Sequence, residues 1–144
     1  MKLFLDNNLP PSLAKALDAL IAPLHHAVHL RDKFPVYTSD LEWIAVLKHE
    51  GGWAILSQDQ FRESSAERKA LAESGLVVYW LSGKQWNKLP LLEKNLAVLE
   101  WTQEILQHAE PAIRAAQKTG KGSAWSIKYV ANNRRRLLVQ EKLT

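Results

Sequence analysis

The chain opens with an apolar run, a polar cluster and two prolines, since residues 2–11 read KLFLDNNLPP. The run over 2–5 is typical of a short buried strand, and the cluster over 6–8 ends it because Asp and Asn bond readily to nearby backbone. Pro10 and Pro11 favour the first turn of a helix, where the N–H that proline lacks would have no partner. This stretch therefore predicts a strand followed directly by a helix.

The same alternation continues to about residue 81. Short apolar runs predict strands, and apolar residues at helical spacing between capping and terminating signals predict helices. The expected strands are 2–5, 25–30, 53–57 and 76–81, separated by helices over 11–22, 39–50 and 64–73, with a loop over 31–38. This order predicts an α/β fold, a three-layer domain in which helices flank a mainly parallel sheet of four or five strands.

The C-terminal half has a longer helical pattern. It covers residues 84–118, with Pro111 expected to kink or break the helix. Residues 124–130 alternate between apolar and polar side chains, which predicts an edge strand. The expected organisation is one domain over 1–130, with its core at 2–81, and a basic C-terminal tail over 131–144.

Composition excludes several classes of protein. The 144 residues are enough for one domain with a substantial core, and 47% of them are hydrophobic. The chain has no cysteine, which excludes disulfide scaffolds, thiolate zinc sites and cysteine nucleophiles. No apolar run is long enough for a signal peptide or a membrane span. We therefore expect a cytoplasmic protein with no membrane partner.

The net charge of +4 is unevenly distributed along the chain. Residues 1–110 hold 11 Lys or Arg and 14 Asp or Glu, whereas residues 111–144 hold 8 Lys or Arg and only one acid. An acidic body with a basic C-terminal segment suggests a polyanion held near a site that needs cations. A solvated tail without a ligand would have the same composition.

Four carboxylates are expected at one edge of the sheet. Ligands of an open α/β sheet lie at the carboxyl ends of its strands. Asp6 follows the first strand and Asp59 the third, and Asp40 and Glu42 begin the helix that leads into the third strand. Carboxylates gathered this closely repel one another unless a cation lies between them, and oxygen ligands suit Mg²⁺ or Mn²⁺. The set predicts a metal site that activates water for attack on a phosphate.

Each acid also has a local explanation. Asp6 and Asp59 suit turns, Asp40 complements the helix dipole, and Glu42 completes a capping box with Ser39. The position of Asp6 after a first parallel strand favours a functional role. For the second ligand, both Asp40 and Glu42 stay open.

Histidines and tryptophans give weaker signals. His25 and His29 share one side of a predicted strand, which would allow a metal pair, but structural histidines are the better interpretation. Trp53, Trp80 and Trp101 fall within buried patterns, whereas Trp86 and Trp125 fit either a core or a base-stacking role.

Four segments of the chain carry a family resemblance: 5–17 (LDNNLPPSLAKAL), 28–32 (VHLRD), 39–44 (SDLEWI) and 53–59 (WAILSQD). Through them the chain resembles the PIN-like nucleases, and among them the VapC-type toxins of type II toxin–antitoxin pairs. The likeness covers about residues 2–81, and the motifs are more specific in this order than any one of them alone.

This resemblance implies a metal-dependent ribonuclease in which three or four carboxylates hold Mg²⁺ or Mn²⁺. By position, Asp6 is the first catalytic acid, Asp40 or Glu42 the second, and Asp59 the third. A fourth acid is missing from the matching positions or comes from elsewhere in the chain, with Glu63 as the candidate.

The resemblance also assigns supporting residues. Ser57 stands where the family often has a hydroxyl near the metal, and Asn8 where an amide supports the first acid. We further expect five arginines to contact RNA phosphates. These are Arg31, Arg62, Arg134, Arg135 and Arg136.

The expected function is therefore that of an endoribonuclease toxin with RNA as its substrate. The expected protein partners are a cognate antitoxin and a second copy of the chain. A PIN-like module that binds RNA or protein without cleaving is the alternative. Asn7 stands where related sequences are frequently acidic, and the segment 58–60 has Asp59 but not the extra acid often found there. A phosphoacceptor receiver domain ranks third, since Asp6 is the only acid directly after the first strand.

Overall fold

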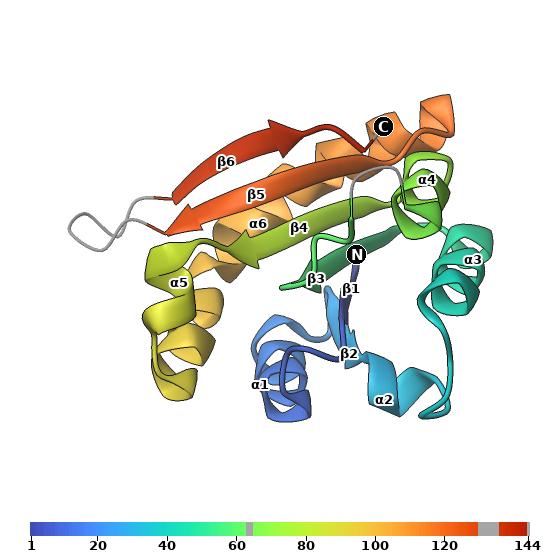
Figure 1. Ribbon diagram of the computed structural model, residues 1–144. Helices are drawn as coiled ribbons and strands as arrows, with labels where there is room; N and C mark the ends of the chain where they lie inside the picture. Colours follow the sequence, from blue (N-terminus) through green and yellow to red (C-terminus); the bar gives the residue numbers. More distant parts are fainter. Residues whose placement is uncertain (63–64, 130–135, 144) are drawn as a thin grey trace.

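The computed structural model describes residues 1–62, 65–129 and 136–143. Within the described residues, each strand up to residue 82 is followed by one or two helices, and the last two elements are both strands (Figure 1). The elements are β1 (Lys2–Leu5), α1 (Pro11–Ile21), β2 (His26–His29), α2 (Leu30–Lys33), α3 (Asp40–Glu50), β3 (Trp53–Ser57), α4 (Ala66–Ala72), β4 (Val77–Ser82), α5 (Lys84–Lys88), α6 (Leu91–Thr119), β5 (Ser123–Tyr129) and β6 (Arg136–Glu141).

The strands form one sheet in the order β2-β1-β3-β4-β5-β6. The first five strands are parallel, and β6 alone pairs antiparallel, with β5. The α/β fold class with a mainly parallel sheet is therefore confirmed. The chain leaves β1 toward β2 on one side and later returns to place β3 on the other side, so the order reverses at β1. A crevice is expected beyond the carboxyl ends of β1 and β3 for this reason.

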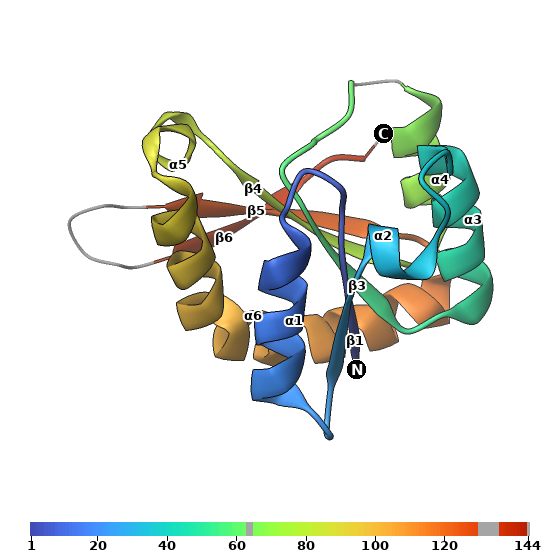
Figure 2. The ribbon, with the colours of Figure 1, turned by 90° about the horizontal axis from the view of Figure 1, so that it is seen from below.

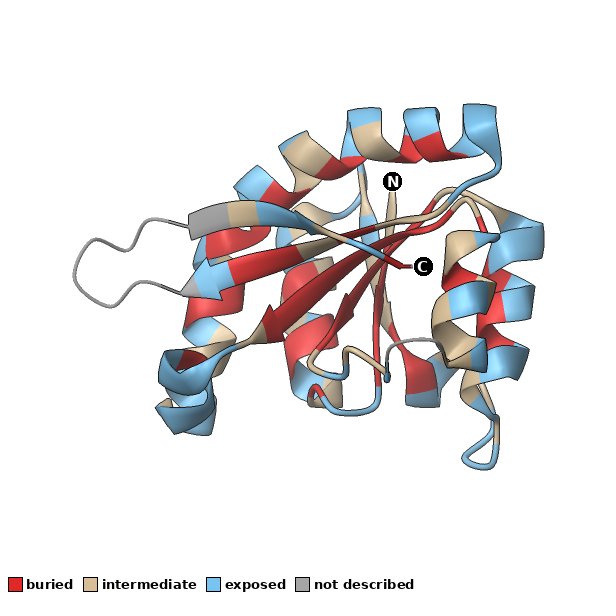
Figure 3. Ribbon diagram, turned by 45° about the horizontal axis from the view of Figure 1, so that its top comes forward, coloured by how far each residue is buried: buried red, intermediate tan, exposed pale blue. Residues whose placement is uncertain are grey.

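Helices cover both faces of the sheet. In Figure 2, α1, α5 and α6 lie on one side of the strands, and α2, α3 and α4 lie on the other. Each side has its own hydrophobic core. Because side chains of a strand alternate between faces, Leu3 and Leu5 pack under α1 and α6 while Phe4 packs under α3. All three are at most 1% exposed, and buried residues run along every central strand (Figure 3).

Local signals explain where the helices begin. Pro11 is the first residue of α1, as the missing N–H of proline allows. At the start of α3, Ser39 accepts a hydrogen bond from the backbone N–H of Glu42, whose side chain accepts one from the backbone N–H of Ser39. This capping box sets the position of the first turn of α3. The expected loop 31–38 contains the short helix α2 in its first residues.

The C-terminal half differs from expectation in three respects. Residues 124–130 were expected at an edge of the sheet, but β5 is an inner strand between β4 and β6. The expected basic tail contributes β6, whose backbone pairs with β5 and closes that side of the sheet. Helix α6 continues through Pro111 without a break, because packing along its buried side outweighs the lost backbone hydrogen bond. Among the described residues, no helix is long and apolar enough to span a membrane.

Candidate active site

Asp6 occupies the point where the sheet order reverses. It directly follows β1, is 5% exposed, and donates its backbone N–H to the carbonyl of Leu56 at 3.0 Å. Its carboxylate accepts two hydrogen bonds, from the backbone N–H of Asn7 at 2.6 Å and from the hydroxyl of Ser57 at 2.9 Å. The strand end thus holds one buried carboxylate in a defined orientation.

The pKa of Asp6 is raised above the ordinary value of an aspartate. Burial is the main cause, because it disfavours the charged carboxylate. The hydrogen bonds from Asn7 and Ser57 act in the opposite direction, and the nearby charges of Asp40 and Asp59 raise the pKa further. Two of the other acids expected from the sequence therefore act electrostatically on Asp6, and ionising the buried Asp6 carboxyl costs free energy.

Ser57 and Asn8 form the support around this carboxylate. Ser57, at the end of β3, is 1% exposed and receives an N–H from the Asn8 amide at 3.3 Å. The Asn8 side-chain oxygen accepts the backbone N–H of Gln58, whose own amide donates to the Asn8 carbonyl. The turns after β1 and β3 are thereby joined next to the Asp6 carboxylate.

Asp59 lies in the turn after β3. Its backbone N–H donates to Ser57 at 3.0 Å, and its carboxylate accepts the backbone N–H of Phe61 at 2.9 Å. Phe61 has a φ of 54°, in the left-handed region, so this turn adopts an uncommon conformation for a non-glycine residue. Asp59 is exposed and faces solvent beside the buried Asp6.

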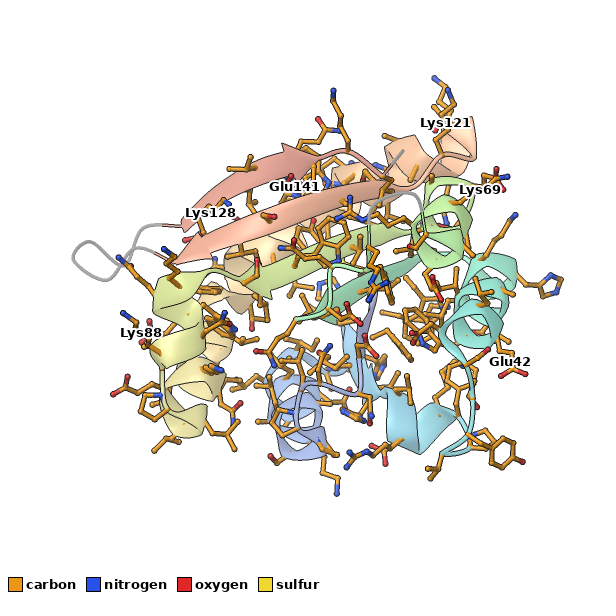
Figure 4. All side chains as sticks on the ribbon, viewed as in Figure 1. Glu42, Lys69, Lys88, Lys121, Lys128 and Glu141 are labelled. Carbon is orange, nitrogen blue, oxygen red and sulfur yellow. The ribbon has the colours of Figure 1, made fainter. Side chains whose placement is uncertain are left out.

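Asp40 and Glu42 separate at the start of α3. Asp40 is partly buried, accepts the indole N–H of Trp43 at 2.9 Å, and lies close enough to raise the pKa of Asp6. Glu42 is exposed, is held by the Ser39 backbone N–H at 2.6 Å, and lies on the outer side of α3 (Figure 4). The structure brings Asp40, and not Glu42, toward Asp6. The capping box holds the Glu42 side chain at the end of α3.

Three of the five arginines expected to contact RNA lie within the described residues. Arg31 in α2 is exposed and donates from Nε to the Asn7 side chain at 2.8 Å, next to Asp6. Arg62 is exposed in the segment after β3. Arg136 is the first residue of β6. The fourth-acid candidate Glu63 and the arginines Arg134 and Arg135 lie outside the described residues.

Two residues near the site, His29 and Gln58, were not assigned a functional role from the sequence. His29 is fully buried, accepts the Arg31 backbone N–H at Nδ1, and contacts the Leu9 carbonyl through Nε2 at 2.5 Å. This pairing implies the neutral ring with its proton on Nε2, so His29 positions the turn after β1. Gln58 accepts the indole N–H of the buried Trp86 at 2.9 Å, which fastens the turn after β3 to α5. These contacts join segments that are distant in sequence, so no local sequence pattern predicts them.

The donor chemistry of the site suits a divalent cation. Asp6, Asp40 and Asp59 offer only oxygen, and a cation would offset the cost of ionising the buried Asp6. Among residues 1–62, 65–129 and 136–143, no three His, Cys, Asp or Glu side chains lie close enough together to hold a metal ion. Mg²⁺ usually keeps several waters and binds through one or two carboxylates, so a closed three-ligand group is not required.

Comparison with known proteins identifies the first part of the chain. A family model described as "PIN like domain" matches residues 1–83, more than half of the chain. The match extends from β1 to the end of β4 and includes Asp6, Asp40 and Asp59. The helices and strands from α5 onward lie beyond it. No curated protein and no solved structure matches the chain.

Proposed function

Because the chain belongs to the PIN-like domain family, we propose that it is a metal-dependent endoribonuclease that acts as the toxin of a type II toxin–antitoxin pair. The observation that carries the proposal is the buried Asp6 carboxylate at the reversal point of the sheet, with the charges of Asp40 and Asp59 acting on it. A buried acid that is costly to ionise and has acidic neighbours is typical of a functional site.

In this proposal, Asp6 and Asp40 hold Mg²⁺ or Mn²⁺ at the inner side of the site and Asp59 contributes from its solvent side. When bound, such an ion supplies an activated water and compensates the negative charge that develops on the phosphate. Ser57 orients the Asp6 carboxylate through its hydroxyl, and Asn8 holds Ser57. Arg31, fixed by Asn7 beside Asp6, is positioned to contact a phosphate oxygen of the RNA.

Cleavage assays with matched variants test the activity. The wild type is expected to cleave single-stranded RNA in Mg²⁺ or Mn²⁺ and to stop in EDTA, and Asp6→Asn and Asp40→Asn are expected to lose cleavage. Glu42→Gln removes the same charge, keeps the capping interaction that Gln also makes, and is expected to cleave like the wild type. Equal cleavage by wild type and Asp6→Asn, or no cleavage by the wild type under any condition, contradicts the assignment.

The second candidate is a PIN-like module that binds RNA or a protein without cleaving. It is favoured by the finding that no three metal-ligating side chains in the described part of the chain lie together. Calorimetric titration with Mn²⁺ separates the two candidates. Binding that is lost in Asp6→Asn supports the nuclease, and absence of binding by the wild type supports the module.

The protein partners are a further part of the proposal. As a toxin the chain would bind a cognate antitoxin, and it would also form a homodimer. Exposed leucines at the start of α6, Leu91, Leu92 and Leu96, support a protein contact at that surface. Co-purification with the product of an adjacent reading frame, and light scattering of the chain alone, test these two partners separately.

A further inference from the structure

The basic C-terminal segment is divided between two opposite ends of the sheet. Strand β5 runs parallel to β4, so Lys128 near its end pairs in register with Ser82 at the end of β4. Strand β6 runs the other way and brings Glu141 back beside Ala124 at the start of β5. Lys121, before β5, and Lys142, after β6, therefore lie at the amino ends of the parallel strands. Figure 4 shows Lys128 and Lys121 at the two ends of β5.

Two further lysines join Lys128 at the carboxyl ends of the strands. Helix α5 begins at Lys84, two residues after Ser82, and ends at Lys88. Lys88 and Lys128 lie at the same end of the molecule in Figure 4. All three lysines are exposed, and none of them makes an ion pair with another described residue. This group, Lys84, Lys88 and Lys128, is called the carboxyl-end lysines below.

Hydrogen bonds connect the end of β4 to the candidate site, and strand pairing connects it to Lys128. Ser57 binds Asp6, and Gln60 in the following turn donates to the hydroxyl of Ser82 at 2.5 Å. Ser82 is the register partner of Lys128. Strands β1, β3, β4 and β5 are successive neighbours in the sheet, so three spacings of about 4.8 Å separate the backbones of β1 and β5 by about 14 Å. One continuous edge thus leads from the acids to the lysines.

We propose that Lys84, Lys88 and Lys128 bind the phosphate backbone of single-stranded RNA that extends from the acid cluster across the ends of β4 and β5. The inference rests on the proposed function, and it assigns the substrate path to residues beyond the 1–83 family match. The acids of the site repel a polyanion, so the binding free energy has to come from cations outside it. Lysines without ion-pair partners can supply it by releasing counterions from the phosphates.

The size of the effect follows from the salt dependence of such contacts. For single strands, each phosphate contact changes the slope of log K against log salt by about 0.7. Compared with 1 M salt, one contact at 0.1 M therefore strengthens binding about fivefold. Removing all three carboxyl-end lysines is expected to weaken binding about 100-fold at 0.1 M salt and to reduce the slope by about 2.

Two triple variants of equal charge test the path. The first is Lys84→Gln, Lys88→Gln and Lys128→Gln, and the control is Lys118→Gln, Lys121→Gln and Lys142→Gln, whose lysines are exposed at the opposite end of the sheet. Fluorescence anisotropy with a labelled oligouridylate, in EDTA to keep the RNA intact, measures affinity between about 50 and 200 mM salt. Equal thermal midpoints verify that both variants are folded.

The expected result is loss of affinity and slope in the first variant, with less than about threefold change in the control. Equal losses in the two variants, or a larger loss in the control, overturn the path and leave the proposed ribonuclease standing if the wild type cleaves RNA. Absence of oligouridylate binding by the wild type overturns the path as well. In that case the cleavage assay described above decides independently on the proposed function.

Discussion

Replacing Asp6 with Asn is expected to stabilise the metal-free protein while it abolishes cleavage. Asp6 is 5% exposed, and burial together with Asp40 and Asp59 raises its pKa. Asn has nearly the same shape and keeps an oxygen that can accept the Asn7 N–H. The substitution removes a buried charge with little change in packing, so the folded state gains stability at each pH at which Asp6 would be ionised.

The magnitude and its pH dependence follow from proton linkage. A carboxyl with a higher pKa in the folded than in the unfolded chain binds more protons when folded, so stability falls as pH rises between the two values. Below the unfolded value of 3.8 the penalty is absent, and above the folded value it is complete. Each unit by which folding raises the pKa of Asp6 costs about 1.4 kcal/mol. In a chain of this size, 1 kcal/mol corresponds to about 2–4 °C in melting temperature.

Thermal unfolding in EDTA from pH 4 to pH 8 measures this difference. The melting temperatures of wild type and Asp6→Asn are expected to converge at the acidic end and to separate as pH rises, with the variant higher. Glu42→Gln is the control, because it removes one exposed carboxylate of the same region and is expected to follow the wild type at all pH values. At a free Mg²⁺ concentration of about 100 times Kd, the wild type alone gains about 2.7 kcal/mol, which reverses the order.

A less stable Asp6→Asn protein in EDTA at pH 8 would refute the reasoning. It would mean that the hydrogen bonds to the Asp6 carboxylate outweigh the cost of burying its charge. A constant difference between the two proteins across the pH range would refute it too, since the stability change would then come from packing and not from ionisation.

Three other substitutions have defined outcomes. Ser57→Ala removes the O–H that binds the Asp6 carboxylate, so the pKa of Asp6 is expected to rise further. The free energy of unfolding at neutral pH is expected to fall by about 1.5–3 kcal/mol. The acidic limb of the kcat/KM profile, measured by RNA cleavage in Mn²⁺, is expected to move to higher pH. Gly122→Ala places a Cβ 2.0 Å from the carbonyl oxygen of Leu71 and is expected to cost more than about 2 kcal/mol, because backbone has to move. Gly120→Ala, with a φ of +71° but open space around it, is expected to cost only about 1 kcal/mol, and urea denaturation that ranks the two variants in the reverse order would contradict this.

The N-terminal half of the fold was predictable because its signals are local. The run over 2–5, the prolines at the start of α1 and the capping box at Ser39 each act within a few residues, and each element forms where the sequence places it. The position of Asp6 at the end of β1 follows from the same patterns. The parallel sheet follows as well, because helices between successive strands allow parallel pairing.

The C-terminal half was less predictable because it depends on long-range pairing. The backbone of residues 136–141 pairs with β5, and this pairing turns a segment that reads as a basic tail into the last strand of the sheet. Pro111 predicts a break from local sterics, but burial of the neighbouring side of α6 keeps the helix continuous. Propensity is outweighed in both places by contacts between residues distant in sequence.

The sequence by itself determined the alternation of elements, the family, and the acids available at the strand ends. Only the tertiary structure decided which acid lies near Asp6, because Asp40 and Glu42 are both in the first turn of α3. The packing of that helix against β1 brings Asp40 toward Asp6 and leaves Glu42 in the capping box. It also decided where the positive charge lies. The antiparallel return of β6 places Lys142 at one end of the sheet and leaves Lys128 at the other, a separation that follows from strand direction and that no count of charges along the chain contains.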